Sequence, residues 1–331
     1  MDTPRNRIGR SAIALVVCSL MAIGFAGVAH ADAPVHVVAS FDEARGENPE
    51  GIAIGRTGSI FVSVSPLGDV WRFAPGSDDP EPFAHVPGIV PGRDFGLLGL
   101  AIDVFGNVYG AVQSASTAAN GVWRFDRWTG DATRLPGTSG IGIPNGLAFD
   151  KQKNLYVTDS ARGAIWRIPW RGSAAVWVQD TKLTGDFSLG LGLGANGIAI
   201  QRGVLTVTNT ERRTILRIPN AHGEAGPISV VTTLPMGDNP DGVAMDVFGN
   251  AYVCFNLADT VGRIAPSGTM TVVASGDPLD FPSSVAFGTA RGKRSTLYGV
   301  NFSIGELFGQ PSGSGPGVFS IGVGVPGMPV P

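Results

Sequence analysis

Short apolar runs separated by turn-forming residues fill the chain from residue 36 onward, and one such pattern recurs six times. In its clearest copy, the apolar run Pro240–Met245 is followed by a Gly249-Asn250 turn and a second apolar run, Ala251–Phe255. Each copy predicts two short strands joined by a tight turn. A spacing of about 40–50 residues between strand-built copies is typical of a β-propeller with one copy per blade. The copies open at Pro49–Ile54, Leu98–Asp103, Pro144–Asp150, Ala195–Ile200, Pro240–Met245 and Pro282–Phe287.

A third strand follows in five copies and carries an Arg among apolar residues, which we interpret as structural; these arginines are Arg72, Arg124, Arg167, Arg217 and Arg263. The last copy contains only Leu297–Asn301 and Gly317–Ile321 after its opening, so it is one strand short. The lone strand His36–Phe41 would complete it and remove the exposed sheet edges. We therefore predict an all-β fold, a six-bladed β-propeller closed by an N-terminal strand in the last blade.

The position just before the repeated glycine is the informative one, because equivalent positions on innermost strands converge on the axis of a propeller. In order, it is occupied by Glu50, Leu98, Asn145, Asn196, Asp241 and Ser283. A position that required only packing would hold small or apolar residues throughout. Two carboxylates and two amides together indicate a site for a hard divalent cation, most simply Ca²⁺, which prefers oxygen ligands.

The N-terminus has the features of a signal peptide. Three arginines precede an apolar run from Ser11 to Val28, and Ala29-His30-Ala31 fits the small-residue cleavage pattern. An uncleaved membrane anchor is the alternative, because the apolar run approaches spanning length. We expect residues 1–31 to be a signal peptide and residues 32–331 a single propeller domain that is secreted or periplasmic, with no membrane attachment after cleavage.

Composition narrows the choice of partner and chemistry. The formal charge is −3, and removing three Arg and one Asp with residues 1–31 gives −3 − 2 = −5. An acidic balance argues against nucleic acid as a partner. Cys254 alone remains of the two cysteines, so no internal disulfide is expected and the thiol should be buried.

Other catalytic motifs are missing from the sequence. There is no G-x-S-x-G, C-x-x-C or H-E-x-x-H pattern, which argues against a serine triad and against zinc. Gly288–Ser295 is one residue short of a phosphate-binding loop, and we interpret it as a basic surface turn. Asp103–Asn107 and Asp246–Asn250 lack the alternating acids of an EF-hand, and hairpin turns in which Asp bonds its own backbone are expected there.

With its local motifs, the ordered set Glu50, Asn145, Asn196 and Asp241 resembles the SMP-30/gluconolactonase/LRE-like family of six-bladed propellers. Pro240-Asp241-Gly242-Val243-Ala244-Met245-Asp246 followed by Gly249-Asn250 carries the resemblance best, and the likeness spans about residues 36–325. It implies one catalytic divalent metal at the axis, held by these four residues, and hydrolysis of lactones or related esters. Asp241 would then be both a ligand and the general base.

One departure from the family pattern concerns the substrate. Sugar-lactonase members carry an Arg two positions before the first Asn ligand, and here that position is Ile143. A hydrophobic lactone or ester is therefore expected rather than an aldonolactone. The alternative function is a non-catalytic exported propeller, similar to NHL-type repeat proteins, in which calcium would be structural and a protein or small molecule would bind one face.

Overall fold

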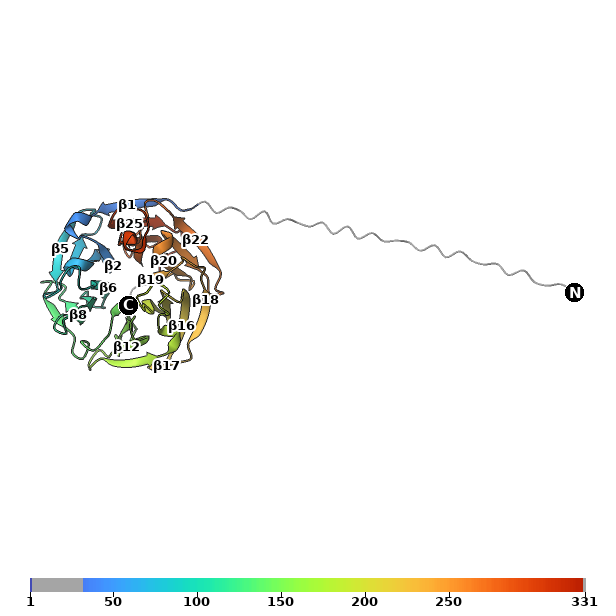
Figure 1. Ribbon diagram of the computed structural model, residues 1–331, viewed down its shortest axis with the longest axis horizontal. Helices are drawn as coiled ribbons and strands as arrows, with labels where there is room; N and C mark the ends of the chain where they lie inside the picture. Colours follow the sequence, from blue (N-terminus) through green and yellow to red (C-terminus); the bar gives the residue numbers. More distant parts are fainter. Residues whose placement is uncertain (2–31, 330–331) are drawn as a thin grey trace. The chain divides into compact units, whose positions relative to one another are not determined.

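The computed structural model describes Met1 and residues 32–329, and the expected signal peptide therefore lies outside the described residues apart from Met1. Residues 32–329 form one compact unit made of six small antiparallel sheets. Figure 1 shows these sheets as blades around a central axis, with the sequence running once around the ring. The six-bladed β-propeller predicted from the repeats is confirmed.

In the first three blades, four consecutive strands run from the axis to the rim. The first blade consists of β2 (Pro49–Ile54), β3 (Ile60–Val64), β4 (Asp69–Phe73) and β5 (Pro80–His85). The second consists of β6 (Gly96–Ile102), β7 (Val108–Gln113), β8 (Gly121–Phe125) and β9 (Ala132–Arg134). The third consists of β10 (Pro144–Phe149), β11 (Leu155–Asp159), β12 (Ala164–Ile168) and β13 (Ala175–Gln179).

The fourth blade differs from the others because its third strand continues into an extra two-stranded ribbon. It consists of β14 (Ala195–Gln201), β15 (Val204–Asn209), β16 (Thr214–Ala221) and β18 (Ser229–Thr233), and β17 (Glu224–Ala225) pairs with the end of β16. The fifth consists of β19 (Pro240–Met245), β20 (Ala251–Phe255), β21 (Thr260–Ile264) and β22 (Met270–Ser275). Within residues 32–329, five short 3-10 helices lie in connections at Glu43–Arg45, Ser65–Leu67, Thr181–Leu183, Asn256–Ala258 and Gly305–Phe308.

The last blade closes the ring as predicted. It consists of β23 (Pro282–Phe287), β24 (Thr296–Asn301), β25 (Gly317–Gly322) and, outermost, β1 (Val35–Ser40). Val35 pairs with Ile321 and Ser40 with Gly317, so the beginning of the described domain is held in the sheet that ends it (Figure 1). The last blade is thus four-stranded only because residues far apart in sequence pair.

The repeated glycine is explained by the close approach of neighbouring blades. A Cβ on Gly146 would lie 2.4 Å from the backbone oxygen of Asn196, and a Cβ on Gly197 would lie 2.4 Å from that of Asp241. No real Cβ tolerates such a contact, so only glycine lets each innermost strand pack directly on the next. Ser284 in the sixth blade is the exception among the repeats.

The hydrophobic core is divided into six clusters, each between two adjacent blades. Leu97 and Val108 of the second blade, for example, pack with Val70 and Phe61 of the first. Faces of neighbouring sheets bury each other in this way, which matches the alternating apolar positions along the strands. Cys254 is buried on β20, as expected.

The main difference from the sequence-based description is at the rim. The outer strands β5, β9, β13, β18 and β22 were not predicted from sequence, because all their residues except Ala274 are half-buried or exposed and lack a strong apolar pattern. The turns were predicted well: Asp246 Oδ1 accepts hydrogen bonds from the backbone nitrogens of Phe248 and Asn250 at 2.9 Å each. Residues 288–295 connect β23 and β24 as a turn.

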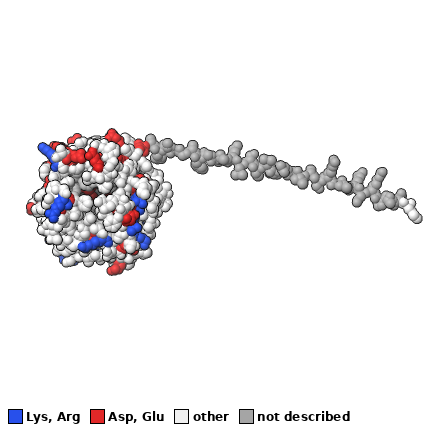
Figure 2. Space-filling model, viewed as in Figure 1, with Lys and Arg blue, Asp and Glu red and all other residues white. Residues whose placement is uncertain are grey.

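The surface face in Figure 2 carries side chains of both charges separated by large uncharged areas. Among the described residues, no helix is long and apolar enough to cross a membrane.

Candidate metal and substrate site at the propeller axis

Glu50, Asn145, Asn196 and Asp241 lie on four different innermost strands and are all buried. All four line a cavity of about 80 Å³ on the side of the loops between blades, and also a second cavity of about 110 Å³ further along the axis. The structure therefore brings together the four residues selected from sequence. Leu98 joins the first cavity and Ser283 the second, so the other two innermost positions also face the axis.

The two carboxylates of this site are strongly perturbed. Burial, followed by the charge of Asp241, raises the pKa of Glu50 well above its ordinary value, and Glu50 Oε2 is buried with no hydrogen-bond partner. Burial raises the pKa of Asp241 to about 7, although hydrogen bonds from Asn256 and Asn196 oppose this by favouring the ionised form. Two carboxyl groups in this position repel when both are ionised, and a cation would remove that repulsion.

Hydroxyl groups directly after the second strands β11 and β15 orient the two amides. Thr210 Oγ1 donates to the backbone oxygen of Pro240 at 2.9 Å and accepts from Asn196 Nδ2 at 2.9 Å. Ser160 Oγ likewise donates to the Ala195 oxygen at 2.7 Å and accepts from Asn145 Nδ2 at 3.3 Å. Because each hydroxyl hydrogen is committed to a backbone carbonyl, the amide nitrogen must face the hydroxyl. The amide oxygens are then the atoms that remain for a cation.

The donor set fits a divalent cation. It combines two carboxylates, one with an orphaned buried oxygen, and two amides with oriented oxygens, which are the ligand types that Ca²⁺ prefers. The set contains only two residues of the His, Cys, Asp and Glu types, and residues 32–329 contain no group of three or more of these that could hold a metal. Glu50 and Asp241 would supply the charge, and the two Asn would fix geometry.

The cavity above the four polar residues is predominantly apolar. Its walls include Ile143, at the position where the sequence departs from sugar lactonases, together with leucine and phenylalanine side chains from several loops. These are Phe95, Leu98, Leu189, Leu191, Leu193, Leu257, Phe281, Phe302 and Phe308. At about 80 Å³ the cavity is smaller than the usual small-molecule site of roughly 300–1,000 Å³, so it holds one compact group.

Two residues of this site were missed from sequence. Asn256, in the loop after β20, donates to Asp241 Oδ2 and to the Pro282 oxygen, both at 2.9 Å. Glu211, fully buried, accepts from the backbone nitrogens of Phe187, Leu191 and Gly192 at 2.6, 3.1 and 2.8 Å. Glu211 thereby fixes the loop that contributes Leu189, Leu191 and Leu193 to the cavity. Asn256 and Glu211 both act through contacts with residues distant in sequence, and neither position belongs to the repeated pattern from which the site was predicted.

The fold and the axial cluster together define the class: a six-bladed β-propeller with four polar side chains gathered at its axis. Residues 193–298 match the family model described as the SMP-30/Gluconolactonase/LRE-like region, in agreement with the resemblance found in the motifs. No curated protein matches the chain.

Solved structures are similar to this chain in fold. A candidate gluconolactonase superposes with a TM-score of 0.66 at 18% identity, covering 90% of this chain and 94% of that protein. The calcium-binding protein regucalcin from Agrobacterium tumefaciens gives 0.66 at 16% identity, covering 91% and 97%. Virginiamycin B lyase from Staphylococcus aureus gives 0.56 at 17% identity, covering 82% and 83%. At these identities the similarity establishes the fold and leaves the activity to be argued from the site.

Proposed function

We propose that this protein is an exported hydrolase that uses a divalent cation at the propeller axis to cleave a hydrophobic lactone or related ester. The observation that carries the proposal is the position of Glu50, Asn145, Asn196 and Asp241 at the floor of an apolar cavity. Residues 1–31 would direct export, to the periplasm or beyond. Ca²⁺ is the cation that the oxygen-only donor set favours, and regucalcin, similar in fold, is a calcium-binding protein.

The residues divide the chemistry between them. A divalent cation bound here would polarise the substrate carbonyl and acidify water. Asp241 takes the proton of the attacking water as general base, and its buried position beside Asn256 keeps its carboxylate oriented. Glu50 balances positive charge, while the two Asn hold the geometry without adding charge. The Ile143 wall and the surrounding phenylalanines exclude water and favour an apolar substrate.

The size of the cavity limits which substrates it can hold. A volume of about 80 Å³ accommodates a compact lactone ring or a short acyl group, with any longer portion directed outward between the loops. The same small volume favours the second candidate function, a scaffold in which the cation only fixes the ring. Glu211, which holds the Leu189–Leu193 loop in place, would serve both functions.

A panel of apolar lactones and aryl esters, assayed with added Ca²⁺ and with chelator, tests the proposal. We expect Ca²⁺-dependent turnover that Asp241→Asn abolishes while the circular dichroism spectrum is unchanged. Asp238→Asn is the matched control, because this carboxylate lies three positions earlier and does not line the cavity. Metal-independent turnover, or full turnover by Asp241→Asn, would contradict the mechanism. Calcium binding with no turnover of any substrate would favour the scaffold.

A further inference from the structure

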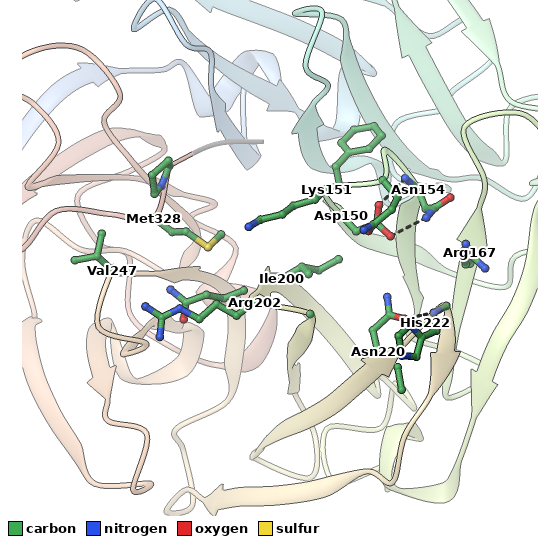
Figure 3. A pocket seen from close by; sticks show the side chains of 17 residues that line it. Asp150, Lys151, Asn154, Arg167, Ile200, Arg202, Asn220, His222, Val247 and Met328 are labelled. Atoms are coloured by element: carbon green, nitrogen blue, oxygen red, sulfur yellow. Dashed lines mark hydrogen bonds between the residues drawn. The ribbon is translucent and has the colours of Figure 1, made fainter.

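A large groove is formed by turns between the first and second strands of the third and fourth blades, together with Val247 of the fifth-blade turn and Met328 and Pro329 near the C-terminus. Its volume is about 1,190 Å³, and none of the four axial residues lines it. Its walls include the β10–β11 turn with Asp150 and Lys151, the β14–β15 turn with Arg202, and the extra β16–β17 ribbon with His222 (Figure 3). The groove is therefore separate from the axial site.

The extra ribbon is fixed against the third blade by specific bonds. Asn220 Nδ2 donates to the Tyr156 hydroxyl at 2.7 Å, and Trp177 Nε1 donates to the Gly223 oxygen at 2.7 Å. Asn220 Oδ1 also accepts from the Gly223 nitrogen at 3.0 Å. These contacts hold the ribbon as a defined wall of the groove.

Arg167, which lines this groove, differs in its hydrogen bonds from its equivalents in the second and fifth blades. In the second blade Arg124 donates to Asn107 Oδ1 at 2.8 Å, and in the fifth Arg263 donates to Asn250 Oδ1 at 3.3 Å. The third blade keeps the corresponding Asp150–Asn154 turn, yet within residues 32–329 no hydrogen bond joins Arg167 to it. The Nε atoms of Arg167 and Arg263 are both buried without a partner, so the difference lies in the missing bond to the turn. Arg167 is half-buried and lines the groove without this bond to its own turn.

Positive charge predominates in the groove. Lys151 and Arg202 are exposed, and Figure 3 shows both extending from their turns into the open space, with Arg167 and His222 on the wall beside Asn220. Among the lining residues, Asp150 is the acidic one. Its carboxylate already accepts hydrogen bonds from Asn154 Nδ2 and the Asn154 backbone nitrogen, at 2.7 and 2.8 Å. The net field in the groove therefore favours an anion.

We propose that this groove is a binding site for a small multivalent oxyanion, a molecule with two or more phosphate or carboxylate groups. Lys151 and Arg202 approach from two turns and would contact separate anionic groups, while Arg167 offers a planar set of donors suited to one oxyanion. The volume exceeds what a single inorganic ion requires, which favours a ligand whose charges are spread over several atoms.

Calorimetric titration of the mature protein with pyrophosphate and, separately, with tricarballylate tests the proposal in calcium-free buffer. We expect a saturable isotherm with at least one of the two, weakened by added salt, and none with a neutral disaccharide. Pyrophosphate alone would identify phosphate as the ligand group, and tricarballylate alone would identify carboxylate. Both Lys151→Gln/Arg202→Gln and Arg167→Leu should weaken binding by about tenfold or more.

Two further variants separate this site from general charge effects and from the axial site. Lys153→Gln/Lys293→Gln removes the same charge, but neither lysine lines the groove; Lys153 instead lies over the Phe105 and Trp170 rings. This control and Glu50→Gln/Asp241→Asn should both bind as the wild type does. The proposal is overturned if neither anion binds, if the groove variants bind normally, or if either of these two variants loses binding.

Discussion

The Asn196 side-chain amide donates to the Thr210 hydroxyl at 2.9 Å, and this hydroxyl donates in turn to the Pro240 carbonyl at 2.9 Å. The bond to the Pro240 carbonyl uses the only hydrogen of the Thr210 hydroxyl, so this hydroxyl can only accept a hydrogen bond from Asn196. The nitrogen of the Asn196 amide therefore faces Thr210. Pro240 directly precedes Asp241, so one hydroxyl links two of the four axial residues.

Thr210→Val should therefore weaken calcium binding without unfolding the propeller. Loss of a group that orients a metal ligand typically costs about 10-fold or more in metal affinity. Thr158→Val is the matched control, because Thr158 Oγ1 donates to the backbone oxygen of Asn196 at 2.6 Å and not to its side-chain amide. Calcium titration of both variants distinguishes the roles; equal affinities would show that the amide needs no such orientation.

Removal of calcium should lower thermal stability. Glu50 and Asp241 belong to the first and fifth blades, and a cation between them links parts of the ring that are distant in sequence. A ligand that binds only the folded state stabilises it by about 2.7 kcal/mol at one hundred times its dissociation constant. Differential scanning calorimetry in chelator and in excess calcium measures the shift. Glu50→Gln/Asp241→Asn should melt at one temperature in both buffers, and an unshifted wild type would exclude a metal site.

The metal-free protein should become less stable as pH rises. In the unfolded chain both carboxyls titrate at about pH 4, whereas burial raises the pKa of Asp241 to about 7 and that of Glu50 well above its usual value. Between these values the folded state binds more protons than the unfolded state, so the free energy of unfolding falls as protons leave. Melting temperatures in chelator should be higher at about pH 5 than at about pH 8.

Calcium should reduce this pH dependence, because it replaces the protons as the positive charge between the two carboxylates. The variant Glu50→Gln/Asp241→Asn serves as the control and should lose this component of the pH dependence. A chelated wild type whose stability rises over the same interval would show that the carboxyls are already ionised in the folded protein.

Gly146→Ala should destabilise the ring. The added methyl would lie 2.4 Å from the Asn196 oxygen, and relief of such a contact requires the third and fourth blades to separate. Overpacking of this kind costs about 1–3 kcal/mol. Gly140→Ala is the control, because no atom lies within 4 Å of its added Cβ. Urea unfolding of both variants gives the difference, and equal midpoints would show that the blades tolerate the methyl group.

The sequence by itself determined the number of blades, the closing strand and the residues that face the axis. This was possible because the blades repeat the same local arrangement. It consists of a short apolar strand, a glycine (Ser284 in the sixth blade) that packs against the next blade, and one side chain that faces the axis. Glu50, Asn145, Asn196 and Asp241 could be selected because they occupy equivalent positions in that repeat.

Only the tertiary structure decided what surrounds those positions. Asn256 and Glu211 act through hydrogen bonds to Asp241 and to residues 187–192, and Arg167 differs from Arg124 and Arg263 in its partners although all three occupy the same repeat position. Such differences arise from loops and from the β16–β17 ribbon, which no repeat specifies. A periodic pattern encodes contacts that recur in every blade, whereas contacts made once depend on how the whole ring brings distant segments together.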